Sequence, residues 1–264
     1  MSSKRYKKLP ENTKTLQANT IDKLLTDIKK NCTSKFDESI DLNMQINNFL
    51  HQISPEKVIR GENAWSESKN LLPLICKRPL LLGRSSATSQ IRNFLARDLR
   101  NLDLEVIEQE LENDCCEIDL KRICLTCIKN NCDAIIAAGG GKVLDAGKLI
   151  AERSHIPCIT VPLSASTCAG WTALANIYTE QGAFIKDQLL NNCPKLLIFD
   201  YSIIRQAPKR TLASGIADAL AKWYEASLSS GNSNDGLIQQ AVQMARVLRD
   251  QLFINATEAI KDNK

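Results

Sequence analysis

The stretch AIIAAGGGKVLDAGK, residues 134–148, decides the fold. Small and branched apolar residues predict a buried strand, three glycines predict a turn, and a helix follows from Lys142. Such a helix directs its free backbone N–H groups beyond the carboxyl end of the strand, which favours binding of an anion such as phosphate. Lys142 supports this interpretation, because a cation in the first turn opposes the helix dipole unless an anion lies nearby. The alternative is a glycine turn that only allows the helix to pack closely on the strand.

The turn matches neither of two common phosphate-binding motifs. Ile136 stands where a Walker A loop needs glycine, and Val143 follows Lys142 where that loop needs Ser or Thr. The spacing also differs from the G-x-G-x-x-G sequence of dinucleotide-binding turns. The residues therefore indicate an anion site, but they match no motif that would identify its ligand.

Apolar runs alternate with helical stretches on both sides of this turn. The alternation predicts an α/β fold with a parallel sheet covered on both faces. Strands are predicted at 79–83, 104–110, 134–141, 157–163 and 195–200, and helices at 87–102, 142–153, 211–228 and 234–253. Gln181-Gly182 between apolar flanks predicts a hairpin at 176–185. We expect three parts: a polar, basic extension (1–56), an α/β dinucleotide-binding domain (57–207) and the start of an all-helical domain (208–264).

Charge and hydropathy argue against two classes of partner. The 264-residue chain has a net charge of +4, but residues 1–32 hold eight Lys or Arg against three Asp or Glu. The remainder is therefore almost neutral, and we expect no nucleic-acid partner. The sequence contains no run of about 18 apolar residues, and no apolar segment follows the basic N-terminus as in a secretory signal. We expect a cytoplasmic protein that does not enter a membrane.

Ten cysteines raise the question of a disulfide framework or a metal cluster, and Cys124-x-x-Cys127 is the suggestive pair. On a helix, Leu120, Cys124, Cys127 and Ile128 form one apolar stripe, in which cysteine acts as a small hydrophobic residue. No second CxxC and no nearby His completes a tetrahedral zinc site. A buried helix in a protein with reduced thiols is the interpretation we favour over a metal cluster.

Three sequence blocks resemble the iron-containing alcohol dehydrogenase superfamily, and within it the glycerol dehydrogenase branch. They are GGGKVLDAGKLIA (139–151), VPLSASTCAGWTALANIYTEQGAF (161–184) and LLIFDYSIIRQAPKRTLASGIADALAKWYEA (196–226), within a similarity that covers residues 58–225. The resemblance implies a dehydroquinate synthase-like architecture, in which a helical domain follows the dinucleotide domain. It also implies a nicotinamide-dependent alcohol or polyol dehydrogenase, in which a divalent metal, usually zinc, polarises the substrate alkoxide during hydride transfer to NAD or NADP.

The resemblance assigns roles to residues of this chain. Those at the pyrophosphate and nicotinamide are Gly140, Gly141, Lys142, Val143 and Asp145. Those lining the rest of the cofactor cleft are Leu163, Ser166, Thr167, Thr172, Leu174 and Tyr178. Asp218 matches the first metal ligand, and the family's two histidine ligands lie beyond Lys264, so we expect a C-terminally truncated relative. His51 and His155 match neither position, and Asp218 has an alternative partner in Lys222 at i+4.

Two further departures from the family concern specificity. Cys168 stands where glycerol dehydrogenases carry an Asp that contacts the polyol, and a neutral thiol is a weak hydrogen-bonding group. Arg84 stands where members that prefer NAD carry an acidic residue on the ribose. An arginine pairs with a 2′-phosphate, so we expect NADP to be favoured over NAD; the alternative is a solvated surface arginine.

Three functions remain open. The first is a zinc-dependent dehydrogenase of small alcohols or polyols, inactive if this chain lacks its metal ligands. The second is a non-catalytic nucleotide-binding protein that acts through partners, and the third is an sn-glycerol-1-phosphate dehydrogenase-type enzyme. Apolar residues of the last two helices lack cover in such a chain, which predicts self-association or a homo-oligomer. These residues are Leu220, Trp223, Val242, Met244 and Leu248.

Overall fold

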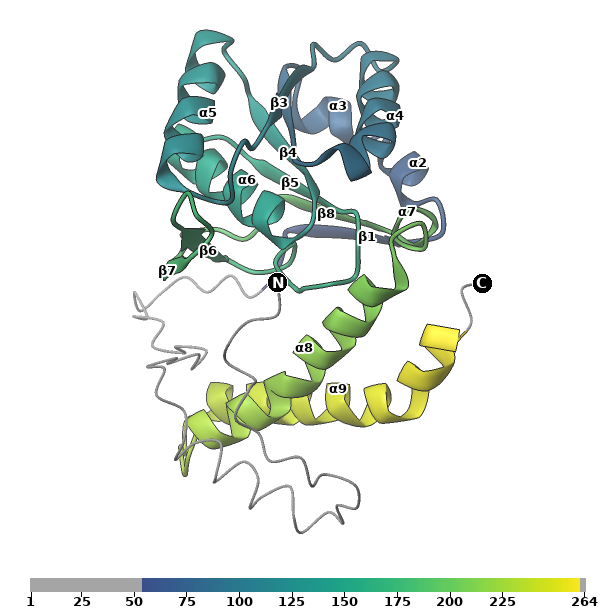
Figure 1. The fold of residues 1–264 in the computed structure, drawn as a ribbon, viewed down its shortest axis with the longest axis vertical. Coiled ribbons are helices and arrows are strands. Elements are labelled where there is room, and N and C mark those ends of the chain that lie inside the picture. Colours follow the sequence, from purple (N-terminus) through teal and green to yellow (C-terminus); the bar gives the residue numbers. More distant parts are fainter. Residues whose placement is uncertain (1–53, 262–264) are drawn as a thin grey trace. The chain divides into compact units, whose positions relative to one another are not determined.

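A computed structural model describes residues 54–261 of the chain. Six strands form a parallel sheet in the order β1-β8-β5-β4-β2-β3, and β6 and β7 form an antiparallel hairpin (Figure 1). The strands are β1 Lys57–Gly61, β2 Pro79–Gly83, β3 Ile107–Glu110, β4 Ala134–Gly139, β5 Cys158–Pro162, β6 Leu174–Tyr178, β7 Phe184–Leu189 and β8 Leu196–Asp200. The helices are α2 Ala64–Ser68, α3 Leu72–Ile75, η3 Ser86–Thr88, α4 Ser89–Arg100, α5 Glu117–Lys129, α6 Gly141–Ser154, α7 Tyr201–Ile204, α8 Lys209–Ser229 and α9 Gly236–Lys261.

The five predicted strands and the hairpin are confirmed, and so is the parallel sheet. Strand β1 was not predicted, nor were the short helices α2, α3 and α7. The predicted helices at 211–228 and 234–253 correspond to α8 and α9, which both extend further. The predicted extension at 1–56 lies almost entirely outside the described residues.

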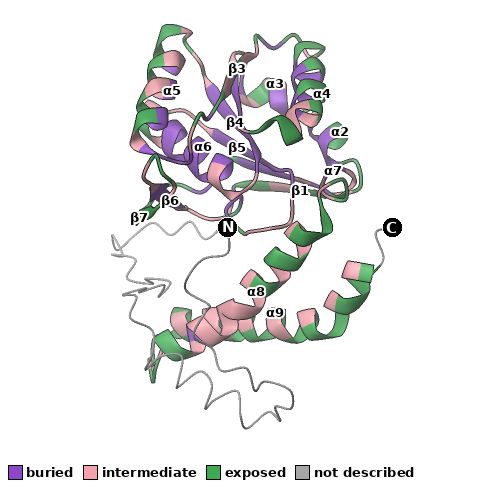
Figure 2. Cartoon of the chain, in the orientation of Figure 1, coloured by how far each residue is buried: buried purple, intermediate pink, exposed green. Residues whose placement is uncertain are grey.

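The sheet is buried on both faces, and alternate residues of each strand contribute to the two sides. In the central strand β4, Ile135 and Ala137 belong to one buried cluster, while Ile136 and Ala138 belong to the other. Helices α5 and α6 cover the first face, and α2, α3 and α4 cover the second (Figures 1 and 2). Burial on both faces explains why these strands read as continuous apolar runs rather than alternating ones.

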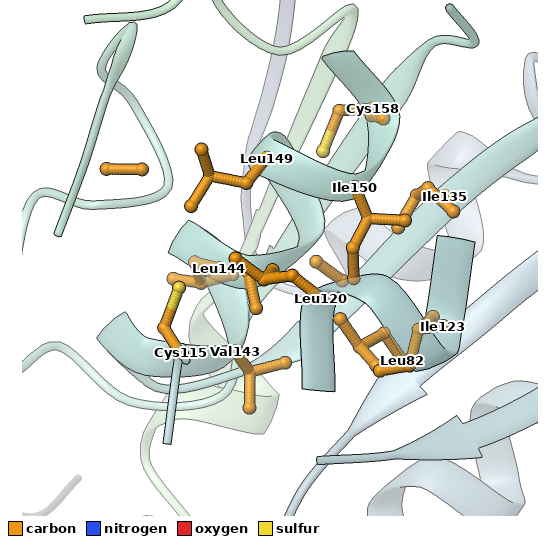
Figure 3. Packing of buried hydrophobic residues seen from close by; sticks show 14 of the residues in the cluster. Leu82, Cys115, Leu120, Ile123, Ile135, Val143, Leu144, Leu149, Ile150 and Cys158 are labelled. Carbon is orange, nitrogen blue, oxygen red and sulfur yellow. The ribbon is translucent and has the colours of Figure 1, made fainter. Parts of the chain in front are cut away.

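Helices α5 and α6 pack side chains together over the first face (Figure 3). Leu120, Ile123 and Cys127 of α5 are buried there, and Cys124 is half-buried against them. These four positions share one side of a helix, which confirms that the cysteines of the CxxC pair belong to an apolar stripe. The inclusion of Ile128 in that stripe is wrong, since its side chain is 69% exposed. Each residue turns the helix by about 100°, which moves Ile128 off the face centred on Leu120 and Cys127.

Glycines allow α6 to lie directly on β4. A Cβ atom at Gly147 would stand 2.4 Å from Cβ of Ala137, and one at Gly139 would stand 2.6 Å from Cβ of Val143. Neither position has room for a side chain. Gly139 in the turn and Gly147 within α6 therefore allow the helix to pack closely on the strand, which was the alternative to anion binding. Val143 is buried by this packing.

Helices α8 and α9 contact each other and bury little of their surface. Ala226 is the one buried residue of α8, and the described part of α9 contains none (Figure 2). Met244 and Leu248 are exposed, as expected from the sequence, whereas Leu220, Trp223 and Val242 are half-buried. Self-association through these helices stays a prediction. Within residues 54–261, no helix combines the length and the apolar character needed to cross a membrane.

Candidate functional site

The middle glycine of the turn faces open space at the carboxyl end of β4. Gly140 is the N-cap of α6, and no described side chain caps this helix. A Cβ atom at Gly140 would approach nothing more closely than the Ser164 Oγ, 4.0 Å away. A Cβ at Gly141 would lie 3.1 Å from Cγ2 of Thr167. The turn is therefore an open cradle of backbone beside the loop after β5, and its first amide groups are suited to a phosphate.

The loop after β5 runs alongside this cradle. Its first residue, Leu163, is buried and donates its backbone N–H to the carbonyl of Gly139 at 3.0 Å. The hydroxyls of Ser164 and Ser166 lie 3.1 Å apart, and Thr167 Oγ1 accepts the backbone N–H of Ala169. The structure thus brings four predicted cleft residues together: Gly140, Gly141, Ser166 and Thr167.

Two predicted phosphate-binding cations share one buried carboxylate, Asp114. Arg84 Nη1 lies 2.8 Å from Asp114 Oδ1, and the ammonium of Lys142 donates to Asp114 Oδ2. The Lys142 Nζ also lies 4.9 Å from the centre of the Tyr178 ring. Sequence reasoning missed Asp114, since a single acidic residue between a strand and a helix carries no recognisable signal.

Arg92 fixes the loop that carries Arg84. Its Nη1 donates to the backbone carbonyls of Arg84 and Ser85 at 3.0 and 2.9 Å, and its Nη2 pairs with Glu110. The side chain passes over Gly83, where a Cβ atom would stand 2.1 Å from Cδ of Arg92. Gly83 at the end of β2 is the sequence signal that could have predicted this close approach.

Asp145 lies in the interior with a lysine as its partner. Lys148 Nζ stands 3.0 Å from Asp145 Oδ1, donates to the carbonyl of Thr172 at 3.1 Å and also donates to the carbonyl of Leu174. Asp145 Oδ2 accepts the backbone N–H of Asn176 at 3.2 Å. Burial raises the pKa of Asp145, against the attraction of Lys148. In the structure these groups connect α6 to the start of the hairpin.

A pocket of about 300 Å³ lies between the loop after β5 and helix α8. It contains Cys168 and Asp218, which the resemblance assigned to the substrate and the metal. Helix α8 approaches the loop so closely at Gly215 that a Cβ atom there would stand 1.8 Å from the carbonyl oxygen of Ala165. Desolvation by the pocket, followed by the negative charge of Asp218, raises the pKa of the Cys168 thiol, which is therefore neutral at pH 7. The lining residues are Pro162, Ala165, Thr167, Cys168, Gly170, Trp171, Leu197, Phe199, Gly215, Asp218, Ala219, Lys222 and Leu248.

The described residues do not assemble a metal site around Asp218. Lys222 Nζ lies 3.8 Å from Asp218 Oδ1 and 3.0 Å from Glu225 Oε2, so a lysine ammonium already faces both carboxylates. Across residues 54–261, no three side chains of His, Cys, Asp and Glu gather in a way that would hold a metal ion. His155 caps the end of α6 in the left-handed conformation, and His51 lies outside the described residues.

Comparison with known proteins gives the same family as the resemblance of the three sequence blocks. The family model described as "Iron-containing alcohol dehydrogenase" matches residues 55–201. The chain is 42% identical over 208 residues to an oxidoreductase from Synechocystis sp., covering 79% of this chain and 54% of that protein. It is 30% identical over 212 residues to a glycerol dehydrogenase from Pseudomonas putida, covering 78% and 58%.

Solved structures agree in fold. The crystal structure of glycerol dehydrogenase from Schizosaccharomyces pombe superposes with a TM-score of 0.70 at 27% identity, covering 81% of this chain and 55% of that one. The chain thus spans somewhat more than half the length of the relatives it matches. Taken with the parallel sheet and the glycine turn, the matched residues show that the chain belongs to the iron-containing alcohol dehydrogenase family.

Proposed function

We propose that this chain binds a nicotinamide dinucleotide along the carboxyl edge of its sheet and contributes to an alcohol or polyol dehydrogenase. The observation that carries the proposal is the cradle at Gly140, where the backbone at a helix N-terminus faces open space beside the loop after β5. The glycerol dehydrogenases among its relatives support a small polyol as the substrate class.

Each part of the site has a distinct task in this proposal. The amides of Gly140 and Gly141 hold the pyrophosphate, and Lys142 adds a positive charge beside it. A nicotinamide dinucleotide held by these residues would supply a hydride acceptor for oxidation of an alcohol to a carbonyl product. Trp171 and Phe199 supply apolar walls for the substrate pocket.

The pocket recognises its alcohol without the aspartate that glycerol dehydrogenases use at the position of Cys168. The polar side chains that line the pocket include the neutral Cys168 thiol, the Thr167 hydroxyl, the Asp218 carboxylate and the Lys222 ammonium. Because a thiol is a weak partner for a hydroxyl, we propose weaker discrimination among polyols than a carboxylate would give.

We further propose a preference for NADP. The side chain of Arg84 is 40% exposed although it contacts Asp114, so part of the guanidinium is accessible to a 2′-phosphate. Titration of the chain with NADPH and NADH tests this directly, and tighter binding of NADH would contradict it.

Substitution of Gly140 tests the site itself. The backbone of Gly140 is extended, with φ −84° and ψ −175°, so any residue fits there without strain. Gly140→Val fills the cradle, and we expect loss of nucleotide binding by calorimetry with unchanged stability. Gly236→Val is the matched control, because a Cβ there has no neighbour within 4 Å, and one at Gly140 meets only the Ser164 Oγ at 4.0 Å. Unchanged affinity in Gly140→Val would refute the location of the site.

Turnover distinguishes the dehydrogenase from a nucleotide-binding protein without catalysis. Reduction of NADP or NAD with glycerol as the substrate, measured with and without added zinc, supports the enzyme if reduced nucleotide accumulates. Nucleotide binding without any turnover under both conditions would favour the non-catalytic alternative.

A further inference from the structure

The carboxylate of Asp114 is fixed in place by its surroundings. Its side chain is only 9% exposed, and two residues that precede it in the loop are bonded to other segments. Leu111 donates its N–H to the carbonyl of Gly83 at 2.9 Å, and Asn113 donates to Asp119 Oδ2 at 2.7 Å. The tip of the hairpin closes over it, since a Cβ atom at Gly182 would lie 2.9 Å from Asp114 Oδ2. These contacts enclose the carboxylate of Asp114 between its own loop and the tip of the hairpin.

The two cations on Asp114 are more accessible than the carboxylate they contact. The side chains of Arg84 and Lys142 are each 40% exposed, against 9% for Asp114. They come from the loop after β2 and from the first turn of α6, which lie at the same edge of the sheet as the glycine cradle. Cations in this arrangement contact a fixed internal anion on one side and offer donors to solvent on the other.

The pair with Arg84 is close but poorly aligned. Arg84 Nη1 approaches Asp114 Oδ1 to 2.8 Å, yet within the described residues this oxygen accepts no hydrogen bond of acceptable geometry. A contact that rests on charge alone is more easily shared with a second anion than one with aligned hydrogen bonds. Arg84 is thus the more readily diverted of the two cations.

We propose that Asp114 is a specificity-determining residue that competes, as a built-in anion, with the nucleotide phosphates for Arg84 and Lys142. This inference rests on the proposed nucleotide site. Asp114 neutralises one of the two positive charges, and it repels a phosphate that approaches from the solvent side. The effect is larger for NADP than for NAD, because the 2′-phosphate adds charge on the side of Arg84. Asp114 therefore reduces the preference for NADP that Arg84 alone would give.

Asp114→Asn tests the proposal, because asparagine keeps the shape and removes the charge. A charge 4–6 Å away shifts ionic equilibria by about tenfold or more. We expect the Kd of NADPH to fall by about tenfold and that of NADH by about threefold. Glu108→Gln is the matched control: it removes the same charge from the neighbouring strand β3, where Glu108 pairs with Arg100, and leaves both affinities unchanged.

The outcomes separate the inference from the function on which it rests. If the wild-type chain binds neither nucleotide, the proposed function fails. If it binds and Asp114→Asn leaves the ratio of the two affinities unchanged, or weakens both, the inference is overturned and Asp114 only orients its neighbours.

A double variant covers the case in which Asp114→Asn does not fold. Arg84→Gln combined with Asp114→Asn removes both members of the Arg84–Asp114 pair and leaves Lys142, the other cation of this cluster, whose side chain is 40% exposed. Compared with Arg84→Gln alone, the double variant should bind both nucleotides about threefold more tightly, through Lys142. Equal affinities of these two variants would overturn the proposal.

Discussion

Replacement of Lys148 by methionine should destabilise the protein more than the loss of one side-chain contact suggests. The ammonium of Lys148 faces the Asp145 carboxylate at 3.0 Å and the backbone carbonyls of Thr172 and Leu174, and its side chain is only 1% exposed. Methionine fills most of the same volume, so packing changes little. The variant therefore tests the charge and its hydrogen bonds.

The expected cost follows from what Lys148→Met leaves behind. Breaking a buried ion pair from one side costs about 3–5 kcal/mol, because the remaining charge has no partner. The two carbonyls also lose a charged donor, and each unsatisfied buried acceptor costs about 1–3 kcal/mol where water does not replace it. We expect the free energy of unfolding to fall by at least about 3 kcal/mol, which is a large part of the usual 5–15 kcal/mol.

Urea unfolding, followed by circular dichroism, measures this loss, and a double-mutant cycle assigns it. Asp145→Asn with Lys148→Met removes both charges, so the double variant should be more stable than Lys148→Met alone. The loss should also shrink as the pH falls. Burial raises the pKa of Asp145, so the folded single variant binds a proton that the unfolded chain releases, and its stability rises toward acidic pH. Wild-type stability in Lys148→Met, or effects that simply add in the double variant, would refute the reasoning.

Two further predictions concern packing and charge. Gly215→Ala places a Cβ 1.8 Å from the carbonyl oxygen of Ala165, so α8 must move. We expect the free energy of unfolding in urea to fall by about 1–3 kcal/mol. We also expect the pocket to change shape, which would alter the reactivity of Cys168 toward a thiol reagent; no change in either measurement would contradict the close contact. Glu117 accepts two hydrogen bonds from Arg153, which lower the pKa of the Glu117 carboxyl in the folded protein. The stabilisation from this pair is therefore complete above pH 4.5, the ordinary pKa of the group, and disappears as the pH falls through the lower pKa of the folded state. Glu117→Gln should cost about 0.3–1 kcal/mol at pH 7, because both side chains are partly exposed, and the difference from wild type should vanish in acid; a constant difference would refute the assignment.

The sequence predicted those parts of the fold that have a strong local pattern. Strands buried on both faces produce long apolar runs, and the three glycines mark the turn at Gly140, so the central sheet and helix α6 were found. Edge strand β1 was missed because its burial alternates weakly and Arg60 and Lys57 are exposed, which leaves no apolar run to recognise. The apolar stripe identified the buried side of α5 but not its width, and only the packing against α6 excluded Ile128.

The candidate site was less accessible to sequence reasoning than the fold. Residues such as Gly140, Thr167 and Cys168 were assigned through family resemblance, and the structure brings them to one edge of the sheet. Asp114 and Arg92 were not found, because their importance depends on partners that are distant in sequence and adjacent only after folding. A list of residue types at fixed spacings does not contain that information.

The position of β1 in the sheet has a consequence for synthesis on the ribosome. β1 pairs with β8, which comes from the far end of the α/β domain, and nearby Trp65 donates its backbone N–H to Asp200, 135 residues later. Closing so long a loop costs entropy that only the final contacts offset. The emerging chain therefore carries β1 and the backbone N–H of Trp65 without their partners until β8 leaves the exit tunnel. The sheet is completed by its first and last strands together.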